Sequence, residues 1–219
     1  SGAGAAALAQ TSFRPDAVVV GEPTDLSLIH AHKGSIRWHV QTSGVSAHSS
    51  APERGVNAIH RMGRVLDMIE NDIAPDLTTR RHPLLGPATI NVGTIHGGMQ
   101  ANIVPAHCEV DIDRRTLPSE NTLALTAEFR RRLDALSPEG AGFASVDLLQ
   151  FYPPLDISRE APICRLAERA MTRALGEARW ATAAWASNAG VFQAAGIPSL
   201  LFGPGSIAQA HTADEFVAL

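Results

Sequence analysis

Residues 44–59 read GVSAHSSAPERGVNAI and join two segments of different periodicity. Upstream, residues 36–42 alternate apolar and polar side chains, which is typical of a half-exposed strand. Downstream, apolar side chains recur at helical spacing over residues 58–69. Glycine and proline residues mark the quoted stretch as a loop, and the small neighbours of its one histidine, His48, leave the imidazole uncovered. A lone loop histidine is more often a surface residue of an ordinary turn than a functional group, so both interpretations stay open here.

The segments around this loop predict an inserted antiparallel unit. Strand, helix, strand, strand, helix and strand follow one another, over residues 35–42, 58–69, 88–92, 104–113, 118–136 and 146–149. This order is the ferredoxin-like βαββαβ arrangement, in which two helices cover one face of a four-stranded antiparallel sheet. We expect residues 71–87, which contain three prolines, to form a long loop.

Continuous apolar runs outside this unit predict a second architecture, of the α/β class. Residues 17–20 and 198–202 are each typical of a strand that is buried on both faces in a parallel sheet. Helices are expected over residues 161–175, just after residues 186–189, and around Asp214 and Glu215. We therefore expect an α/β domain, residues 1–32 and 151–219, that is interrupted by the ferredoxin-like domain at residues 33–150.

Composition excludes several classes of function. The chain has 219 residues and a net charge of −4 without a basic cluster, so it offers no basic surface that would bind nucleic acid. No apolar run approaches the roughly 18 residues that cross a bilayer, so we expect no membrane partner. Two distant cysteines make no disulfide framework and favour a reducing, cytoplasmic setting. Because the chain lacks an initiator methionine and closes within a helical pattern, we expect it to be a fragment of a larger protein.

Two candidate metal ligands follow the buried strands. Glu22 comes just after residues 17–20, and His211 follows residues 198–202 and a glycine-rich loop. Open α/β sheets place their ligands at the carboxyl ends of their strands, so both side chains are expected at the same edge. Carboxylate oxygen and imidazole nitrogen both suit zinc, but a catalytic zinc site needs three protein ligands and an open position. From this spacing alone, Glu22 is equally a solvated loop glutamate.

Several segments together resemble one family, the zinc-dependent aminoacylases, deacetylases and carboxypeptidases of the acetylornithine deacetylase and succinyl-diaminopimelate desuccinylase type. The similar segments are Gly21–Thr24, Gly44–Ile59, Ala101–Pro105, Asp113–Pro118, Gly203–Gly205 and Ala210–Glu215. The resemblance covers essentially all of this chain, but only the later half to two-thirds of the family's length. It implies that residues 33–150 are a lid or dimerisation domain and that the rest is a partial catalytic domain.

The resemblance also implies a two-metal zinc centre. Glu22 matches the acidic residue that binds one metal, and His211 matches the histidine that binds the other. The remaining family ligands and the glutamate that acts as general base lie upstream of the matching segments and have no counterpart in this chain. We therefore expect the chain on its own to be catalytically inactive, with an incomplete or empty metal centre.

Further roles come from the same resemblance. His48 would reach across a homodimer formed through the lid domain and donate a hydrogen bond to the oxyanion of the reaction. Asn102 would contact the substrate, and Arg115 would bind its carboxylate through a two-pronged guanidinium contact. Other substrate-binding residues implied are Ser187, Asn188 and Gly205. Where many members have a Ser/Thr-Asp pair, this chain has Ser187 and Asn188. Without the family, Asn102 is equally a turn residue and Arg115 a solvated charge at a strand end.

The implied function is metal-dependent hydrolysis of the amide bond of N-acyl amino acids in amino-acid metabolism, by a deacetylase or desuccinylase. The substrate is then a small N-acyl amino acid or a dipeptide. Two alternatives stay open: a dipeptidase or carboxypeptidase of the same family, and a non-catalytic dimerisation or binding module. A pure interaction module has no need of five such residues, and this favours the enzyme. The five are Glu22, His48, Asn102, Arg115 and His211.

Overall fold

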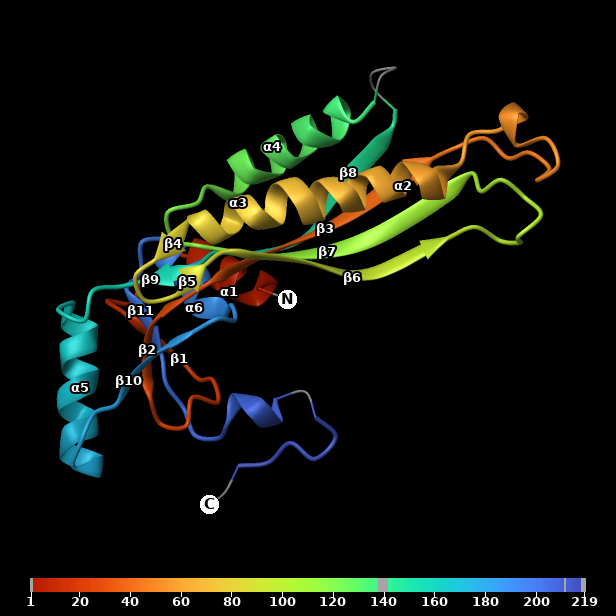
Figure 1. Ribbon diagram of the computed structural model, residues 1–219. Helices are drawn as coiled ribbons and strands as arrows, with labels where there is room; N and C mark the ends of the chain where they lie inside the picture. The colour runs from red at the N-terminus through yellow and green to blue at the C-terminus, as the bar shows by residue number, and fades with distance from the viewer. Residues whose placement is uncertain (1, 138–141, 211, 218–219) are drawn as a thin grey trace. The chain divides into compact units, whose positions relative to one another are not determined.

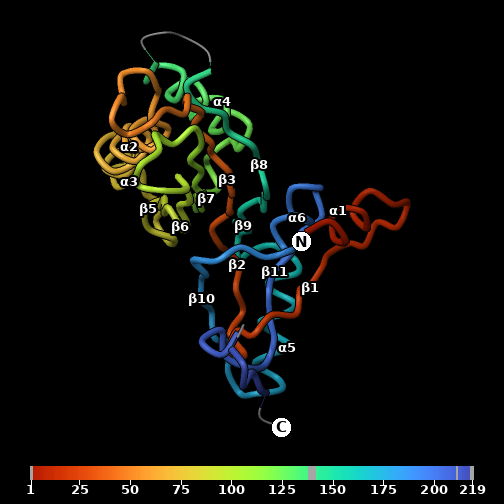
Figure 2. The backbone as a smooth tube through the Cα atoms, turned by 90° about the vertical axis from the view of Figure 1, so that its right-hand side faces the viewer, coloured from red at the N-terminus to blue at the C-terminus, as the bar shows by residue number. Residues whose placement is uncertain are grey.

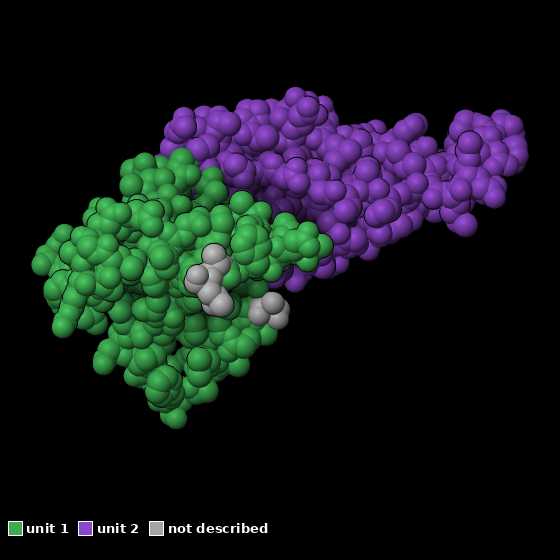
Figure 3. Space-filling model, turned by 90° about the horizontal axis from the view of Figure 1, so that it is seen from below, with its two compact units in different colours: residues 1–35, 82–86, 152–219 green, residues 36–81, 87–151 purple. Residues whose placement is uncertain are grey.

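The computed structural model describes residues 2–137, 142–210 and 212–217, and the chain divides into two compact units. Unit 1 contains residues 1–35, 82–86 and 152–219, and unit 2 contains residues 36–81 and 87–151 (Figure 3). Along the sequence, unit 2 is thus inserted in unit 1, and the short segment 82–86 of unit 1 interrupts it. No helix in the described part of the chain is long and apolar enough to cross a membrane.

The sheet of unit 2 has the strand order β6–β7–β3–β8. Its strands are β3 (Gly34–Ser43), β6 (Thr89–Gly97), β7 (His107–Thr116) and β8 (Ala144–Tyr152). The third strand along the chain, β7, lies between the first two, and it pairs with β6 in antiparallel register. This is the order of a ferredoxin-like sheet, so the predicted fold of the inserted unit is confirmed.

Helices cover one face of this sheet (Figure 1). They are α2 (Ala58–Asp67), α3 (Ala74–Thr79) and α4 (Thr122–Ala135). An asparagine side chain caps α2 and another caps α4: Asn57 accepts from the backbone N–H of His60, and Asn121 accepts from that of Ala124. Strict alternation in β3 and β7 sends one set of side chains beneath the helices, where each is at most 2% exposed: Ile36, Trp38, Val40, Cys108, Val110 and Ile112.

The predicted long loop at residues 71–87 is wrong in its first half. A π-helical segment, Met68–Ile73, continues α2, and α3 follows it directly to Thr79. Pro75 sits in the first turn of α3, where a missing N–H donor is tolerated, and the widened turn before it accommodates the ring. Ile69, Ile73 and Leu77 are all buried and are spaced by four residues, so the apolar stripe runs on through the proline. Beyond α3, β4 (Arg81–His82) and β5 (Gly86–Pro87) form a two-stranded ribbon.

Unit 1 is a mixed sheet with the order β1–β11–β2–β10, which Figure 2 shows as neighbouring strands. Its strands are β1 (Val18–Val20), β2 (Leu28–His32), β10 (Trp180–Ala183) and β11 (Ser199–Leu201), and a short β9 (Leu155–Asp156) also pairs with β2. β1 is parallel to β11 and β10 is parallel to β2, but β2 is antiparallel to β11. The helices of this unit are α1 (Ala3–Gln10), α5 (Pro162–Leu175) and α6 (Asn188–Ala194).

Two further expectations for unit 1 need correction. β11 is fully buried as predicted, but Val19 in the middle of β1 is 50% exposed, because β1 is the last strand of the sheet on its side. The expected helix around Asp214 and Glu215 is absent from residues 212–217, which form turns and irregular chain. A short 3₁₀ turn, Ile207–Gln209, precedes them.

The chain leaves unit 1 and returns to it at neighbouring positions. β2 leads toward unit 2, and β9 follows the return at residue 152. These two strands pair in antiparallel register, with Ala31 opposite Asp156 and His32 opposite Leu155. Insertion between adjacent chain positions leaves the sheet of unit 1 intact, which is why such insertions are tolerated.

His32, at the end of β2, is fully buried and joins this strand to α6. Its Nδ1 lies 2.9 Å from the carbonyl oxygen of Lys33 and must donate to it, so Nε2 is the acceptor in the neutral ring. The Ser187 hydroxyl then donates to Nε2 at 3.0 Å and accepts from the backbone N–H of Ala189, which it caps. Burial lowers the pKa of His32 from 6.5 to about 4, so the ring is neutral near pH 7.

This burial predicts a loss of stability in mild acid. The unfolded chain takes up a proton on His32 near pH 6.5, whereas the folded protein does so only near pH 4. The contribution of neutral His32 to the free energy of unfolding is therefore fully present above pH 6.5. It declines as the pH falls toward 4, by about 3 kcal/mol in total. Denaturant unfolding at successive pH values measures it. His32→Asn should reduce the pH dependence of the free energy of unfolding in this window, whereas His60→Asn, at an exposed position, should leave it unchanged. An equal pH dependence in the parent and both variants contradicts the assignment.

Candidate active site

Two loops at one edge of the unit 1 sheet form the candidate site. Because β1 and β11 are parallel neighbours, the loops that follow them, Gly21–Ser27 and Gly203–Gly205, leave the sheet at the same edge. The Thr24 hydroxyl joins them: it donates to the carbonyl of Ser27 at 2.7 Å and accepts from the Gly203 N–H at 3.1 Å. The loops that contain Glu22 and Gly205 therefore belong to one hydrogen-bonded structure.

The backbone of this edge is tightly constrained. Asp25 and Leu26 both have positive φ, 50° and 56°, which side chains other than glycine rarely adopt. The second loop holds them, because the Asp25 N–H donates to Gly205 and the Leu26 N–H donates to Gly203. A Cβ on Gly203 would lie 2.5 Å from the carbonyl oxygen of Glu22, so only glycine fits there. Strain that is kept by such contacts is more common at functional sites than elsewhere.

The described residues do not by themselves make a zinc site. His211, the second predicted ligand, lies outside the described residues. Within the described ranges, no group of three or more His, Cys, Asp or Glu side chains is arranged to hold a metal. Glu22 is half-buried and supplies a carboxylate of the right chemistry, but one carboxylate does not complete a centre.

In unit 2 the structure brings His48 and Asn102 together. The His48 loop is joined to the loop after β6 by backbone bonds: the Ser49 N–H donates to the carbonyl of Asn102 at 3.0 Å, and the Val104 N–H donates to Ala47 at 2.8 Å. Figure 1 shows both loops at one end of the unit. Gly44 is required here, since a Cβ on it would lie 2.1 Å from the carbonyl oxygen of Val56.

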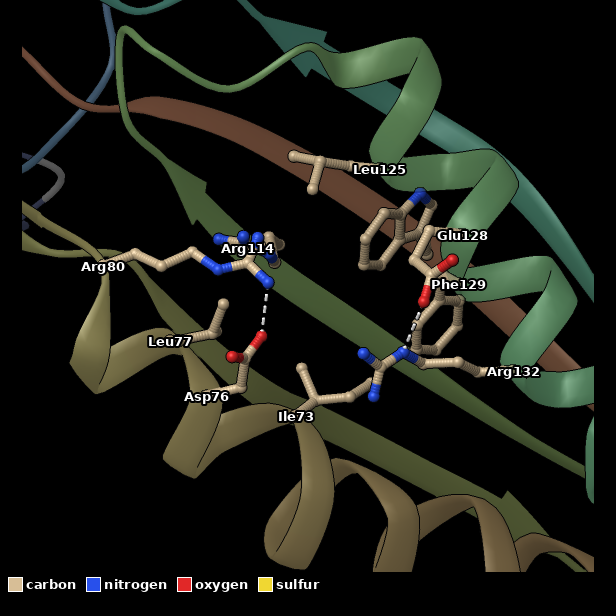
Figure 4. A pocket seen from close by; sticks show the side chains of 10 residues that line it. Ile73, Asp76, Leu77, Arg80, Arg114, Leu125, Glu128, Phe129 and Arg132 are labelled. Carbon is tan, nitrogen blue, oxygen red and sulfur yellow. Dashed lines mark hydrogen bonds and ion pairs between the residues drawn. The ribbon is translucent and has the colours of Figure 1, made fainter.

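Arg114 and Arg115 lie on opposite faces of β7, as alternation predicts. The side chain of Arg114 is 3% exposed and forms an ion pair with Glu120 beneath the helices. Figure 4 shows it in a cleft between α3 and α4, where Arg80 pairs with Asp76 and Arg132 pairs with Glu128. These arginines therefore have carboxylate partners within the unit. Arg115 lies on the open face, where its Nε is 2.7 Å from Asp113.

Ser187 and Asn188 lie at the opposite end of the strands of the unit 1 sheet from Glu22. β2 and β10 run opposite to β1 and β11, so their carboxyl ends point away from the Glu22 loop. Ser187 is bonded to His32 at that far edge and is buried there. Its hydroxyl has a structural use that accounts for it fully, and its assignment to the substrate site remains a prediction.

The hydrogen-bonding roles of two buried residues, His32 and Thr24, were not predicted from the sequence. The sequence suggests for His32 no role beyond that of a surface or packing residue; it is indeed packed in the interior, and its bond to Ser187 was not predicted. Thr24 belongs to the Gly21–Thr24 segment of the family resemblance, which gives it no role of its own. A small hydroxyl beside a proline and a glycine-rich loop could have suggested a residue that joins two turns.

Comparison with known proteins identifies the family. Residues 30–141 match the M20 family's peptidase dimerisation domain. Acetylornithine deacetylase from Edwardsiella ictaluri is 35% identical over 96% of this chain, and the Yersinia pseudotuberculosis enzyme is 36% identical over 95%. The chain covers 54% and 53% of these two proteins, so it spans about half the length of the curated relatives it matches.

Solved structures show the same fold. The dipeptidase Dug1p from Saccharomyces cerevisiae aligns with a TM-score of 0.69 over 98% of this chain and 58% of its own, at 13% identity. Aminopeptidase PepT from Bacillus cereus aligns with a TM-score of 0.66 over 85% of this chain and 48% of its own, at 23% identity. These structures share with this chain the fold of a ferredoxin-like unit inserted in a mixed α/β unit. The chain belongs to the M20 family of aminoacylases, deacetylases and peptidases.

The close approach at Gly203 gives a test of the candidate edge. Gly203→Ala places a methyl group against the Glu22 carbonyl, so one of the two loops must move, and we expect a loss of about 1–3 kcal/mol in the free energy of unfolding. Gly21→Ala is the matched control, because a Cβ there meets nothing within 4 Å. Urea unfolding of both variants measures the difference. Equal stability of the two would show that the loops are not held together as described.

Proposed function

We propose that the whole protein hydrolyses the amide bond of N-acyl amino acids in a metal-dependent reaction, as a deacetylase or desuccinylase. The observation that carries this proposal is the 35–36% identity to acetylornithine deacetylases along 95–96% of the chain. The matched length includes the Glu22 loop, the His48 loop and Arg115. Membership of a family of hydrolases supports the reaction class, and the acetylornithine deacetylases support an acylated amino acid as the substrate.

In this proposal Glu22 and His211 are ligands of a two-zinc centre, whose other ligands and general base come from outside the matching segments. Bound zinc supplies Lewis-acid activation of the scissile amide. The Gly203–Gly205 loop holds the Glu22 loop in place through Thr24, which supports a carboxylate fixed in orientation. Preorganised ligands and donors of this kind lower the reorganisation that accompanies reaction.

Substrate recognition is assigned to the open face of unit 2. Arg115 would exchange its contact with Asp113 for the carboxylate of the substrate, which its guanidinium matches with two hydrogen bonds. Asp113 also pairs with Arg37 at 3.2 Å, so it keeps a cationic partner when Arg115 turns away. Asn102, held beside the His48 loop, and Gly205 would contact the reacting amide.

The oxyanion donor in this proposal is His48 of a second copy in a homodimer formed through unit 2. The match of residues 30–141 to a dimerisation domain supports this assembly. His48 is exposed and its loop is anchored at both sides by backbone hydrogen bonds, which suits a donor that must reach beyond its own unit.

For the full-length enzyme, His48→Ala should lower kcat by about 100-fold or more, the scale of one lost oxyanion donor. KM and zinc content should change much less, because the contact strengthens in the transition state and His48 is no ligand. Steady-state kinetics and metal analysis measure these three quantities. If the protein is a non-catalytic binding module, the unsubstituted parent itself shows no turnover.

Subunit mixing tests whether His48 acts at the active site of the other subunit. Heterodimers of His48→Ala and His211→Ala subunits contain one site with both histidines intact. Part of the activity should therefore return after verified subunit exchange. If exchange is complete and activity stays at the level of the parents, His48 acts within its own subunit or not at all.

The two neighbouring arginines give a second test. Arg115→Ala should raise KM about tenfold or more, since charge-assisted hydrogen bonds to a carboxylate are lost, while stability stays near that of the parent. Arg114→Ala should instead destabilise the protein, because it leaves Glu120 buried without its partner. Kinetics and thermal unfolding of both variants separate the roles. An unchanged KM in Arg115→Ala contradicts its assignment.

A further inference from the structure

The two ring nitrogens of His48 have different surroundings. Nδ1 contacts two groups of the same residue, Ser50: the hydroxyl oxygen at 2.7 Å and the backbone nitrogen at 3.2 Å. A backbone N–H only donates, so Nδ1 must carry its lone pair toward Ser50. In the neutral imidazole the single ring proton is then on Nε2, and the Ser50 hydroxyl donates to Nδ1 as well.

The backbone around this contact is fixed, so the Ser50 N–H is aimed at the ring. The Ala51 N–H donates to the carbonyl of His48 at 2.9 Å, which closes a tight turn over residues 48–51. On the other side, the Ser49 N–H is bonded to Asn102 and a bridge pairs His48 with Ile103. Rotation of the imidazole away from Ser50 therefore gives up two hydrogen bonds without a compensating change in the loop.

We propose that Ser50 is a positioning residue, which holds neutral His48 in the tautomer that carries its proton on Nε2. With Nδ1 engaged inside the loop, Nε2–H is the group that His48 presents outward as a hydrogen-bond donor. The inference rests on the proposed function, in which His48 donates to an oxyanion. The other tautomer would present a lone pair to that negative charge and would repel it.

A purely structural role makes a different prediction for the same contact. If Ser50 only stabilises the turn, its removal lowers thermal stability and leaves the proton distribution on His48 unchanged. If Ser50 sets the tautomer, removal of its hydroxyl takes away the shorter contact on Nδ1 and leaves only the backbone N–H at 3.2 Å, so the preference for Nε2–H weakens and the second tautomer becomes detectable. The ring nitrogens report the difference directly.

The test uses the 219-residue chain labelled with ¹⁵N-histidine, in mildly alkaline buffer where an ordinary imidazole is neutral. Long-range ¹H–¹⁵N spectra distinguish the protonated from the unprotonated ring nitrogen. The parent chain and Ser50→Thr, which keeps the hydroxyl, should show the His48 proton on Nε2 alone, and Ser50→Ala should show a mixture. The neighbouring Ser49→Ala is the matched control and should resemble the parent. A proton on Nδ1 in the parent, or an unchanged spectrum in Ser50→Ala, overturns the proposal.

Kinetics of the full-length enzyme provide the second readout. Ser50→Ala should lower kcat roughly fivefold, the scale of one neutral hydrogen bond, with little change in KM. Ser50→Thr should restore the rate and Ser49→Ala should leave it unchanged. If the spectra agree with the proposal but His48→Ala keeps full activity, the oxyanion role of His48 fails while the tautomer assignment stands. A mixed tautomer in Ser50→Ala with an unchanged kcat removes the positioning role.

Discussion

The parallel pairing of β1 with β11 is the contact on which the candidate active site depends. It brings the Glu22 loop and the Gly203–Gly205 loop to one edge, and the Thr24 hydroxyl then ties them with hydrogen bonds to both. Two consecutive residues with positive φ are retained only because the second loop bonds their N–H groups. The pairing of β1 with β11 thus accounts both for the backbone strain at these two residues and for the close approach of Gly203 to Glu22.

Much of the inserted unit could be predicted from periodicity, because its two central strands, β3 and β7, alternate buried and more exposed side chains. Alternation in β3 and β7 identified the buried side chains and separated Arg114 from Arg115. The helix beyond residue 70 was missed because Pro75 is read locally as a breaker, whereas a π-helical turn and a continuing apolar stripe accommodate it. β2 was missed because its two histidines interrupt the kind of continuous apolar run from which β1 and β11 were predicted.

The candidate site was only partly predictable for a related reason. The sequence predicts that Glu22 and His211 follow strands whose carboxyl ends share one side of the sheet, and β1 and β11 are indeed parallel neighbours. His211 itself lies outside the described residues, so its position beside Glu22 stays a prediction. Sequence reasoning could not foresee that β2 and β10 run the other way, which sends Ser187 and Asn188 to the far edge. The meeting of the His48 and Asn102 loops depends on backbone bonds between irregular segments, and such bonds leave no pattern in side-chain chemistry.

The insertion of unit 2 within unit 1 also bears on how the chain folds. Thr24 and Gly203 are 179 positions apart, and ordering a loop of that length costs entropy before its contacts form. During synthesis all of unit 2 emerges before β10 and β11 exist, so it is the part that is able to fold first. Once folded, it brings β2 and β9 side by side and shortens the loop that remains to be closed. The insertion thus makes the late pairing of β1 with β11 a much more local event than the sequence separation suggests.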